Sequence, residues 1–227
     1  MALNIVSKID DRVSVKHVLM SVSDKTGLES FVPALIATCP QVKILSTGGT
    51  FTAIQNMLTP AQAAQHLVSV SDYTGQPEMQ GGLVKTLDFK IYLGILSETY
   101  NEAHQNDLAR THAVAIDMVV VNLYPFKQAV AKPDVTPESA RTNIDIGGPC
   151  MVRASAKNYL RVASVTDPLD YASLIEELKT NNGTLSLNTR FALMKKAFAH
   201  TASYDSAIAA FFTQVAPERI ASTYTLK

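Results

Sequence analysis

One acid and one lysine flank a glycine pair in residues 143–158, which read NIDIGGPCMVRASAKN. Asp145 stands two residues before Gly147, and Lys157 lies ten residues after it. Glycine lets the backbone approach a ligand closely, and a carboxylate with an ammonium group could move a proton and stabilise developing charge. A helix from Gly147 to Lys157 would be about 15 Å long. Taken alone, Lys157 is therefore better explained as a solvated lysine near a helix C-terminus.

Two loops combine small hydroxyl residues with glycine directly after an apolar run. They are SDKTG at 23–27 and TGGT at 47–50. Backbone N–H groups at the start of a helix attract anions, so these loops could form a phosphate cup. The loop residues that could contact a phosphate are Ser23, Lys25, Thr26, Thr47, Gly48, Gly49 and Thr50. A single loop of this kind is usually an ordinary helix cap, but two loops together with Lys85 leave a phosphate site and ordinary caps as equal alternatives.

Other candidate residues carry weaker signals. Asn122 and Tyr124 follow the apolar run 118–121, where a phenol could reach a ligand, although a packed tyrosine with a satisfied hydroxyl is the commoner arrangement. The histidines lack metal-ligand spacing, so we expect structural roles for them and no metal ion. They are His17, His66, His104, His112 and His200. The dinucleotide, P-loop and GxSxG patterns do not occur in the sequence.

The composition argues against nucleic-acid-binding, disulfide-rich and membrane-spanning classes of protein. The 227 residues include 20 Lys plus Arg and 20 Asp plus Glu, so no global basic field exists to hold a nucleic acid. Cys39 and Cys150 have no CxxC spacing, which is typical of a reducing compartment. The N-terminus lacks a signal-peptide pattern and no apolar run could span a bilayer. We expect a cytoplasmic protein with neither nucleic acid nor membrane as a partner.

Apolar runs alternate with helical patterns over the first two thirds of the chain. Strands are predicted at 17–22, 42–46, 67–71, 118–121 and 161–166, with a further apolar segment at 91–96. Helices are predicted at 28–38, 51–58, 100–112 and 169–179, from 137 onward, and from 186 to about 214 with a break near His200. This alternation predicts an α/β fold with a doubly wound, mainly parallel sheet, a mostly helical C-terminal part, and ligands at the carboxyl ends of strands.

Several motifs occur in the order found in the inosine monophosphate cyclohydrolase family, the amino-terminal domain of bifunctional purine biosynthesis proteins. The motifs are SVSDKTG, LSTGGT, VSDYTGQPEM, VKTL, VVVNLYPF, NIDIGGPCMVRASAKN and KAFAHTASYD. The resemblance implies a methylglyoxal-synthase-like fold, no cofactor and a homodimer. We expect a tail at 1–14, the domain at 15–214, and a tail or linker at 215–227. Within the domain, the methylglyoxal-synthase-like core would cover about 15–130 and the C-terminal part 131–214.

The resemblance also implies an activity. The substrate would be a nucleotide monophosphate, formyl-aminoimidazole-carboxamide ribotide, which closes to inosine monophosphate (IMP) with loss of water, so the enzyme is a cyclic amidine hydrolase acting in the dehydrating direction. A formyltransferase domain or a separate formyltransferase would be its partner. The residues implied as catalytic are Lys85, Tyr124, Asp145 and Lys157. Those implied to bind substrate besides the two loops are Thr86, Asn122 and Gly147. We expect Asp145 to be the base, Lys157 to stabilise charge, and Lys85 with Tyr124 to assist oxygen departure.

The chain departs from this family where an arginine, a histidine, a proline and a second histidine are usual. The residues found there are Leu83, Asp88, Phe89 and Tyr92. Leucine cannot supply the paired donors of arginine, so Lys25 or Lys90 would have to compensate. Two alternatives therefore stay open. One is a phosphate-binding regulatory module similar to the allosteric domain of carbamoyl phosphate synthetase. The other is a methylglyoxal-synthase-like lyase, which gives no reason for the NLYPF and DIGG motifs.

Overall fold

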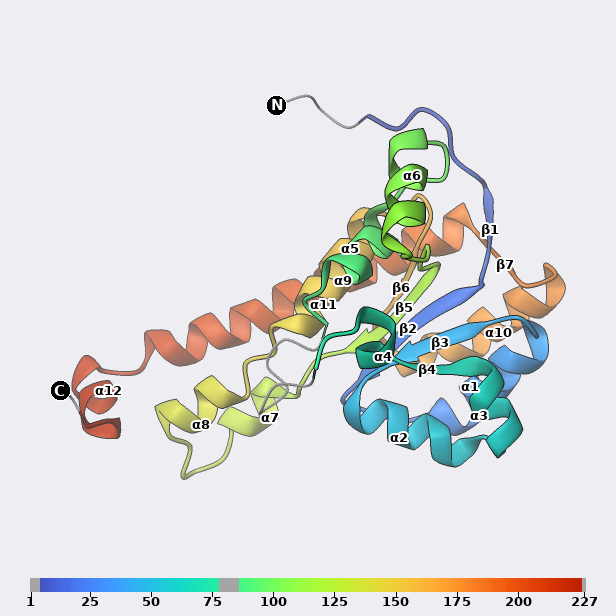
Figure 1. The fold of residues 1–227 in the computed structure, drawn as a ribbon. Coiled ribbons are helices and arrows are strands. Elements are labelled where there is room, and N and C mark those ends of the chain that lie inside the picture. Colours follow the sequence, from blue (N-terminus) through green and yellow to red (C-terminus); the bar gives the residue numbers. More distant parts are fainter. Residues whose placement is uncertain (1–4, 78–85, 226–227) are drawn as a thin grey trace.

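A five-stranded parallel sheet forms the centre of the computed structural model, which describes residues 5–77 and 86–225 (Figure 1). Its strand order is β4-β3-β2-β5-β6. The strands are β2 (His17–Val22), β3 (Lys43–Ser46), β4 (Leu67–Ser69), β5 (Met118–Asn122) and β6 (Ala163–Val165). All four neighbouring pairs are parallel. The predicted α/β fold is confirmed.

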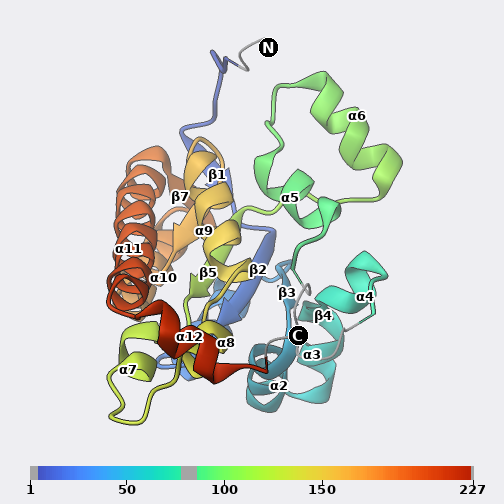
Figure 2. The same cartoon turned by 90° about the vertical axis from the view of Figure 1, so that its left-hand side faces the viewer.

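Helices cover both faces of the sheet, which explains why the strands are apolar on both sides. Val119 of β5 lies opposite Leu19 of β2 and packs in one core, whereas its neighbours Met118 and Val120 pack in the other. The helices over the first core are α1 (Leu28–Thr38), α2 (Gly48–Met57) and α10 (Tyr171–Thr180). Those over the second are α5 (Phe89–Leu96), α9 (Gly147–Lys157) and α11 (Leu187–Thr213). Figure 2 shows α9 and α11 side by side.

The chain changes direction at β2, which has β3 on one side and β5 on the other. It runs from β2 outward to β4, and then returns to β5 and runs outward to β6 on the opposite side. Val22 and Asn122 are register partners at the carboxyl ends of these two central strands. In open α/β sheets such a switch point opens a crevice between the loops that follow the strands. The loops after β2 and β5 carry predicted site residues, as does the connection from β3 to α2.

Several elements differ from the sequence predictions. The apolar run at 91–96 lies in α5, and α11 continues past His200 without a break. A two-stranded sheet joins β1 (Arg12–Ser14) to β7 (Thr184–Ser186), so part of the expected N-terminal tail is a strand. The remaining elements are α3 (Pro60–His66), α4 (Val70–Thr74), α6 (Glu102–Thr111), α7 (Phe126–Val130), α8 (Pro137–Thr142), η2 (Pro168–Asp170) and α12 (Pro217–Thr223). Of these, α12 lies within the expected C-terminal tail and contacts α8.

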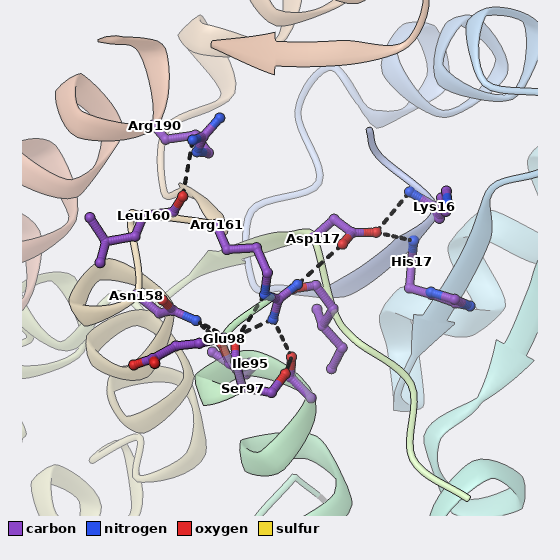
Figure 3. Close-up of polar contacts among 12 residues, drawn as sticks. Lys16, His17, Ile95, Ser97, Glu98, Asp117, Asn158, Leu160, Arg161 and Arg190 are labelled. Carbon is purple, nitrogen blue, oxygen red and sulfur yellow. Dashed lines mark hydrogen bonds and ion pairs between the residues drawn. The ribbon is translucent and has the colours of Figure 1, made fainter. Parts of the chain in front are cut away.

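Two buried arginines hold the amino ends of the strands together. Arg161, just before β6, pairs with Asp117 at 3.2 Å and donates to the Ser97 carbonyl at 3.0 Å (Figure 3). Asp117 in turn accepts the amide of His17 at 2.9 Å. Arg190 is fully buried and donates to backbone oxygens of the N-terminal segment, β7 and the turn before β6. These hydrogen bonds satisfy buried carbonyls at the amino end of the sheet. The loops that carry the predicted site residues lie at the opposite, carboxyl end.

Candidate active site at the carboxyl end of the sheet

A cavity of about 510 Å³ lies at the switch point between β2 and β5. Its walls come from the loop after β2, the start of α2, the loop after β5 and the segment that leads into α9. The predicted loop residues that line it are Ser23, Lys25, Thr47, Gly48, Gly49 and Thr50. The other predicted residues that line it are Thr86, Asn122, Tyr124, Asp145 and Gly147. Residues separated by more than a hundred positions in sequence therefore meet at one cavity.

Among the residues that the structure describes, two predicted site residues do not line this cavity. Thr26 is exposed, and its hydroxyl donates to the Asp24 carboxylate at 2.6 Å, so it shapes the loop from outside. Lys157 is exposed at the last turn of α9, the opposite end of the helix from Gly147. Lys85 lies outside the described residues, as does the departure at Leu83.

The start of α2 combines helix-start amides with a nearby lysine. Thr47 makes no side-chain cap hydrogen bond within the described chain, so the first-turn amides of Gly48 and Gly49 are available. The Nζ atom of Lys25 lies 4.0 Å from the position a Cβ on Gly49 would take. Thr50 has a different role, because its hydroxyl both accepts the amide and donates to the carbonyl of Val22, at 3.0 and 3.1 Å. Thr50 thus fixes α2 to the end of β2.

Lys25 is the only lysine or arginine that lines the cavity in the described ranges 5–77 and 86–225. Lys90, the other candidate to replace the missing arginine, directs its Nζ to the Tyr73 carbonyl at 3.4 Å and does not line the cavity. A neighbouring hollow beyond Asn122 contains Lys196, whose Nζ is held by Asp170 at 2.7 Å. The Nζ atom of Lys25 donates to the carbonyls of Val22 and Ser23 at 3.5 and 3.4 Å and has no carboxylate within ion-pair distance among the described residues. In that part of the chain, a lysine charge lies beside the helix-start amides of the cavity only at Gly49.

Asn122 positions the loop that follows β2. Its Oδ1 accepts the amides of Ser23 and Asp24 at 2.7 and 2.8 Å, and its Nδ2 donates to the Asp24 carbonyl at 2.8 Å. Its side-chain oxygen is therefore already used, and one N–H remains for a ligand. The prediction that Asn122 binds the substrate stays a prediction, while its hydrogen bonds with the loop after β2 are observed.

Asp145 is held in the wall of the cavity by the helix that follows it. Its Oδ1 accepts the Gly148 amide at 2.9 Å. Burial raises the pKa of the Asp145 carboxyl, and amide hydrogen bonds from Gly148 and Tyr124 oppose the rise. A carboxyl with a raised pKa is suited to act as a base at physiological pH.

Close approach explains the glycine pair at the start of α9. A Cβ on Gly147 would lie 2.4 Å from the Thr86 hydroxyl, and a Cβ on Gly148 would lie 2.3 Å from Oδ2 of Asp145. Any side chain at either position would displace a residue that lines the cavity. The two glycines therefore let Thr86 and Asp145 reach the same space.

The mouth of the cavity is partly apolar. Tyr124 is 54% exposed and Ile146 is 56% exposed, although both line the cavity. The packed, satisfied arrangement expected for an isolated tyrosine is thus wrong for Tyr124. Sequence reasoning missed Ile144, Ile146 and Met151, because apolar residues carry no chemical signature; their proximity to Asp145 in the NIDIGG motif was the available signal.

The departure at Asp88 has a local structural reason. Asp88 is 4% exposed and caps α5 by accepting the amide of Lys90 at 2.8 Å. It also accepts the side-chain amide of Gln76 at 2.7 Å. The carboxylate is therefore occupied and does not line the cavity, so the acid adds no free negative charge beside the loops SDKTG and TGGT.

Comparison with known proteins identifies the family of this chain. A family model described as "MGS-like domain" matches residues 27–150. The chain belongs to the MGS-like domain family. A second model, "AICARFT/IMPCHase bienzyme", matches residues 155–227 of this MGS-like chain. The two matches agree with the family indicated by the sequence motifs.

Close relatives of the MGS-like chain include the bifunctional purine biosynthesis protein PurH from two strains of Leptospira biflexa serovar Patoc. Each is 46% identical over 202 residues, which are 89% of this chain and 38% of the relative. The chain thus spans well under half the length of these relatives. Among solved structures, the crystal structure of ForH has a TM-score of 0.72 and 30% identity, and the match covers 88% of this chain and 100% of ForH. Within the described residues, no helix has the length and apolar character needed to traverse a bilayer.

Proposed function

We propose that this MGS-like protein is an IMP cyclohydrolase of purine biosynthesis, which closes formyl-aminoimidazole-carboxamide ribotide to IMP and water. The observation that carries the proposal is the convergence of Lys25, Gly49, Tyr124 and Asp145 on one cavity. The identity to PurH and the AICARFT/IMPCHase match support it.

The phosphate of the ribotide would bind at the start of α2. Helix-start amides at Gly48 and Gly49 and the charge of Lys25 supply donors and a cation. Anchoring the phosphate there directs the rest of the nucleotide along the cavity toward Asp145. Holding the carboxamide nitrogen and the formyl carbon in attack geometry would be the largest contribution to the rate.

The chemistry would proceed by addition and then loss of water. The carboxamide nitrogen attacks the formyl carbon, and Asp145 takes the proton that this nitrogen loses. The formyl oxygen receives this proton and becomes a hydroxyl group. It then takes a second proton, released by the nitrogen of the former formamide, and leaves as water while that nitrogen forms the ring C–N double bond. Tyr124, exposed at the mouth, and Lys85, next in sequence to the cavity residue Thr86, would assist this departure.

The role of Lys157 is the least supported part of the catalytic set. We keep the charge-stabilising role because of the family resemblance. Within one copy of the chain, α9 separates Lys157 from Gly147 by about 15 Å. No described contact of Lys157 with the cavity supports the role.

The cellular setting is also a proposal. The match to the AICARFT/IMPCHase bienzyme model supports a formyltransferase as partner, either as a domain or as a separate protein. We propose a homodimer that works in the cytoplasm on a nucleotide monophosphate.

An absorbance assay for conversion of the formylated ribotide to IMP tests the proposal. Turnover by the purified chain, abolished by Asp145→Asn, is the expected result. Binding of IMP without turnover would favour a regulatory module instead. Release of methylglyoxal from dihydroxyacetone phosphate would favour a lyase.

A further inference from the structure

The hydroxyl of Tyr204 joins α11 to the segment that carries Asp145. It accepts the Asp145 amide at 2.7 Å and donates to the Asn143 carbonyl at 3.3 Å. Both backbone groups belong to the short connection between α8 and α9, and Tyr204 is 59 residues from Asp145 in sequence. One hydroxyl therefore pins the connection on both sides of Ile144, a residue that lines the cavity.

The ring of Tyr204 also contacts the other loop of the site. It packs edge-on against Phe126, with ring centroids 6.2 Å apart. Phe126 is 1% exposed and begins α7 two residues after Tyr124. Phe211, seven residues further along α11, contacts the same Phe126 ring, with ring centroids 6.1 Å apart. Tyr204 thus stands between the loop that carries Tyr124 and the segment that carries Asp145.

Asp145 is held at two separate points as a result. Tyr204 fixes its backbone amide at 2.7 Å, and the Gly148 amide fixes its carboxylate at 2.9 Å. The first contact comes from α11 and the second from α9. Removing the first would leave Asp145 held only through its carboxylate, by the amides of Gly148 and Tyr124.

We propose that Tyr204 is a positioning residue for the cyclohydrolase reaction, which sets the place of the Asp145 carboxylate from α11 without touching the substrate. The inference rests on the proposed function of Asp145 as base. Tyr204 is 8% exposed and does not line the cavity, so a direct contact with substrate does not explain it. A displacement of a catalytic group by about 1 Å can cost on the order of a hundredfold in rate.

The test is Tyr204→Phe, which removes the hydroxyl and keeps the ring. We expect kcat to fall about 10- to 100-fold while KM stays within about twofold, because the phosphate cup is untouched. The acid limb of the kcat–pH profile should move to lower pH, because a loosened Asp145 gains solvent and its raised pKa falls toward the ordinary value. The titratable groups that face this segment are Tyr92 of α5, Tyr124, and Tyr204 and Asp205 of α11. Burial raises the pKa values of Tyr92 and Tyr204, so the tyrosines do not contribute to the acid limb. The residue-specific titration described below distinguishes Asp145 from Asp205.

Tyr73→Phe is the matched control. The Tyr73 hydroxyl also accepts one part-buried backbone amide, that of Val114 at 2.9 Å, and Tyr73 does not line the cavity. Both variants should lose similar thermal stability. Only Tyr204→Phe should lose kcat and shift the profile.

A titration of the Asp145 carboxyl by carbon NMR separates this inference from the proposed function, because it needs no turnover. A lower Asp145 pKa in Tyr204→Phe supports the positioning role even if the wild-type chain converts no ribotide. If Tyr204→Phe does not fold, 3-fluorotyrosine at position 204 keeps the ring and weakens the hydroxyl as an acceptor, and a smaller change in the same direction is expected. Wild-type kcat together with an unchanged Asp145 pKa, in whichever of these proteins folds, would overturn the proposal.

Discussion

The carboxylate of Asp145 occupies the space that a side chain on Gly148 would need. The Gly148 amide donates to Oδ1 at 2.9 Å, and a Cβ on Gly148 would lie 2.3 Å from Oδ2 and 2.7 Å from Leu123. Gly148→Ala must therefore push the carboxylate out of place. We expect a loss of kcat of about a hundredfold and a loss of about 1–3 kcal/mol in unfolding free energy, measured by the absorbance assay and urea denaturation.

Gly183→Ala controls for the loss of stability alone. Gly183 has a φ of +77°, so alanine there is strained, but it lies in the turn before β7, away from the cavity. We expect a cost of about 1–2 kcal/mol with kcat unchanged. Full activity in Gly148→Ala would show that the Asp145 carboxylate need not occupy its observed position.

Asp145→Asn separates catalysis from stability. The pKa of Asp145 is raised in the folded protein, so this carboxyl weakens folding as pH rises through the window between its ordinary and its raised pKa. Asparagine carries no charge and can still accept the Gly148 amide. We expect turnover to be lost while the melting temperature at neutral pH equals or exceeds that of the wild type. In the wild type, kcat should decline as acid protonates the base. A melting temperature well below wild type would argue against burial as the cause of the shift.

Lys25→Met tests the phosphate cup. Losing the cation beside Gly49 should raise KM about tenfold and leave kcat within about twofold, because the lysine binds a group remote from the reacting atoms. Lys90→Met is the control, since Lys90 contacts Tyr73 and does not line the cavity. Steady-state kinetics at fixed ionic strength measures the difference. A larger effect at Lys90 would assign the compensating charge to that residue instead.

Lys157→Ala tests the least supported member of the catalytic set. Because Lys157 is exposed at the end of α9, thermal stability should not change. The role implied by the family requires a fall in kcat of about a hundredfold. Turnover that stays at the wild-type level would remove Lys157 from the mechanism.

Arg161→Met should destabilise the fold strongly. It would leave Asp117 buried with its charge uncompensated and would take one of two side-chain donors from the Ser97 carbonyl, at a cost of about 3–5 kcal/mol. Burial already raises the pKa of Asp117, so the deficit should shrink in acid as this carboxyl takes a proton. Arg110→Met breaks the exposed pair with Asp107 and should cost less than about 1 kcal/mol in the same denaturation experiment. Equal losses of unfolding free energy in Arg161→Met and Arg110→Met would contradict the importance of burial.

Much of the sheet could be predicted, because a buried parallel strand is a short apolar run with turn residues at its ends. The same rule is ambiguous at 91–96, because the apolar run IYLGIL is equally compatible with a buried helix. Asp88, which caps α5, is the residue that favours the helix. The cavity residues at strand ends were predictable from topology. The tie between Tyr204 and Asp145 was not, because it joins residues 59 positions apart through tertiary packing. The separation of Lys157 from the cavity followed from helix length, and the observed length of α9 agrees with it.

The buried arginines at the amino ends of the strands lie at the other end of the sheet from the substrate loops. The sheet therefore has an arginine-tied end, which holds the strands together, and a loop end, which lines the cavity. Substitutions in the cavity-lining loops, such as those at Ser23 or Ile146, leave the arginine-tied end of the sheet intact. Because the two ends are separate, the loops can diverge toward other substrates while the contacts that hold the sheet stay the same.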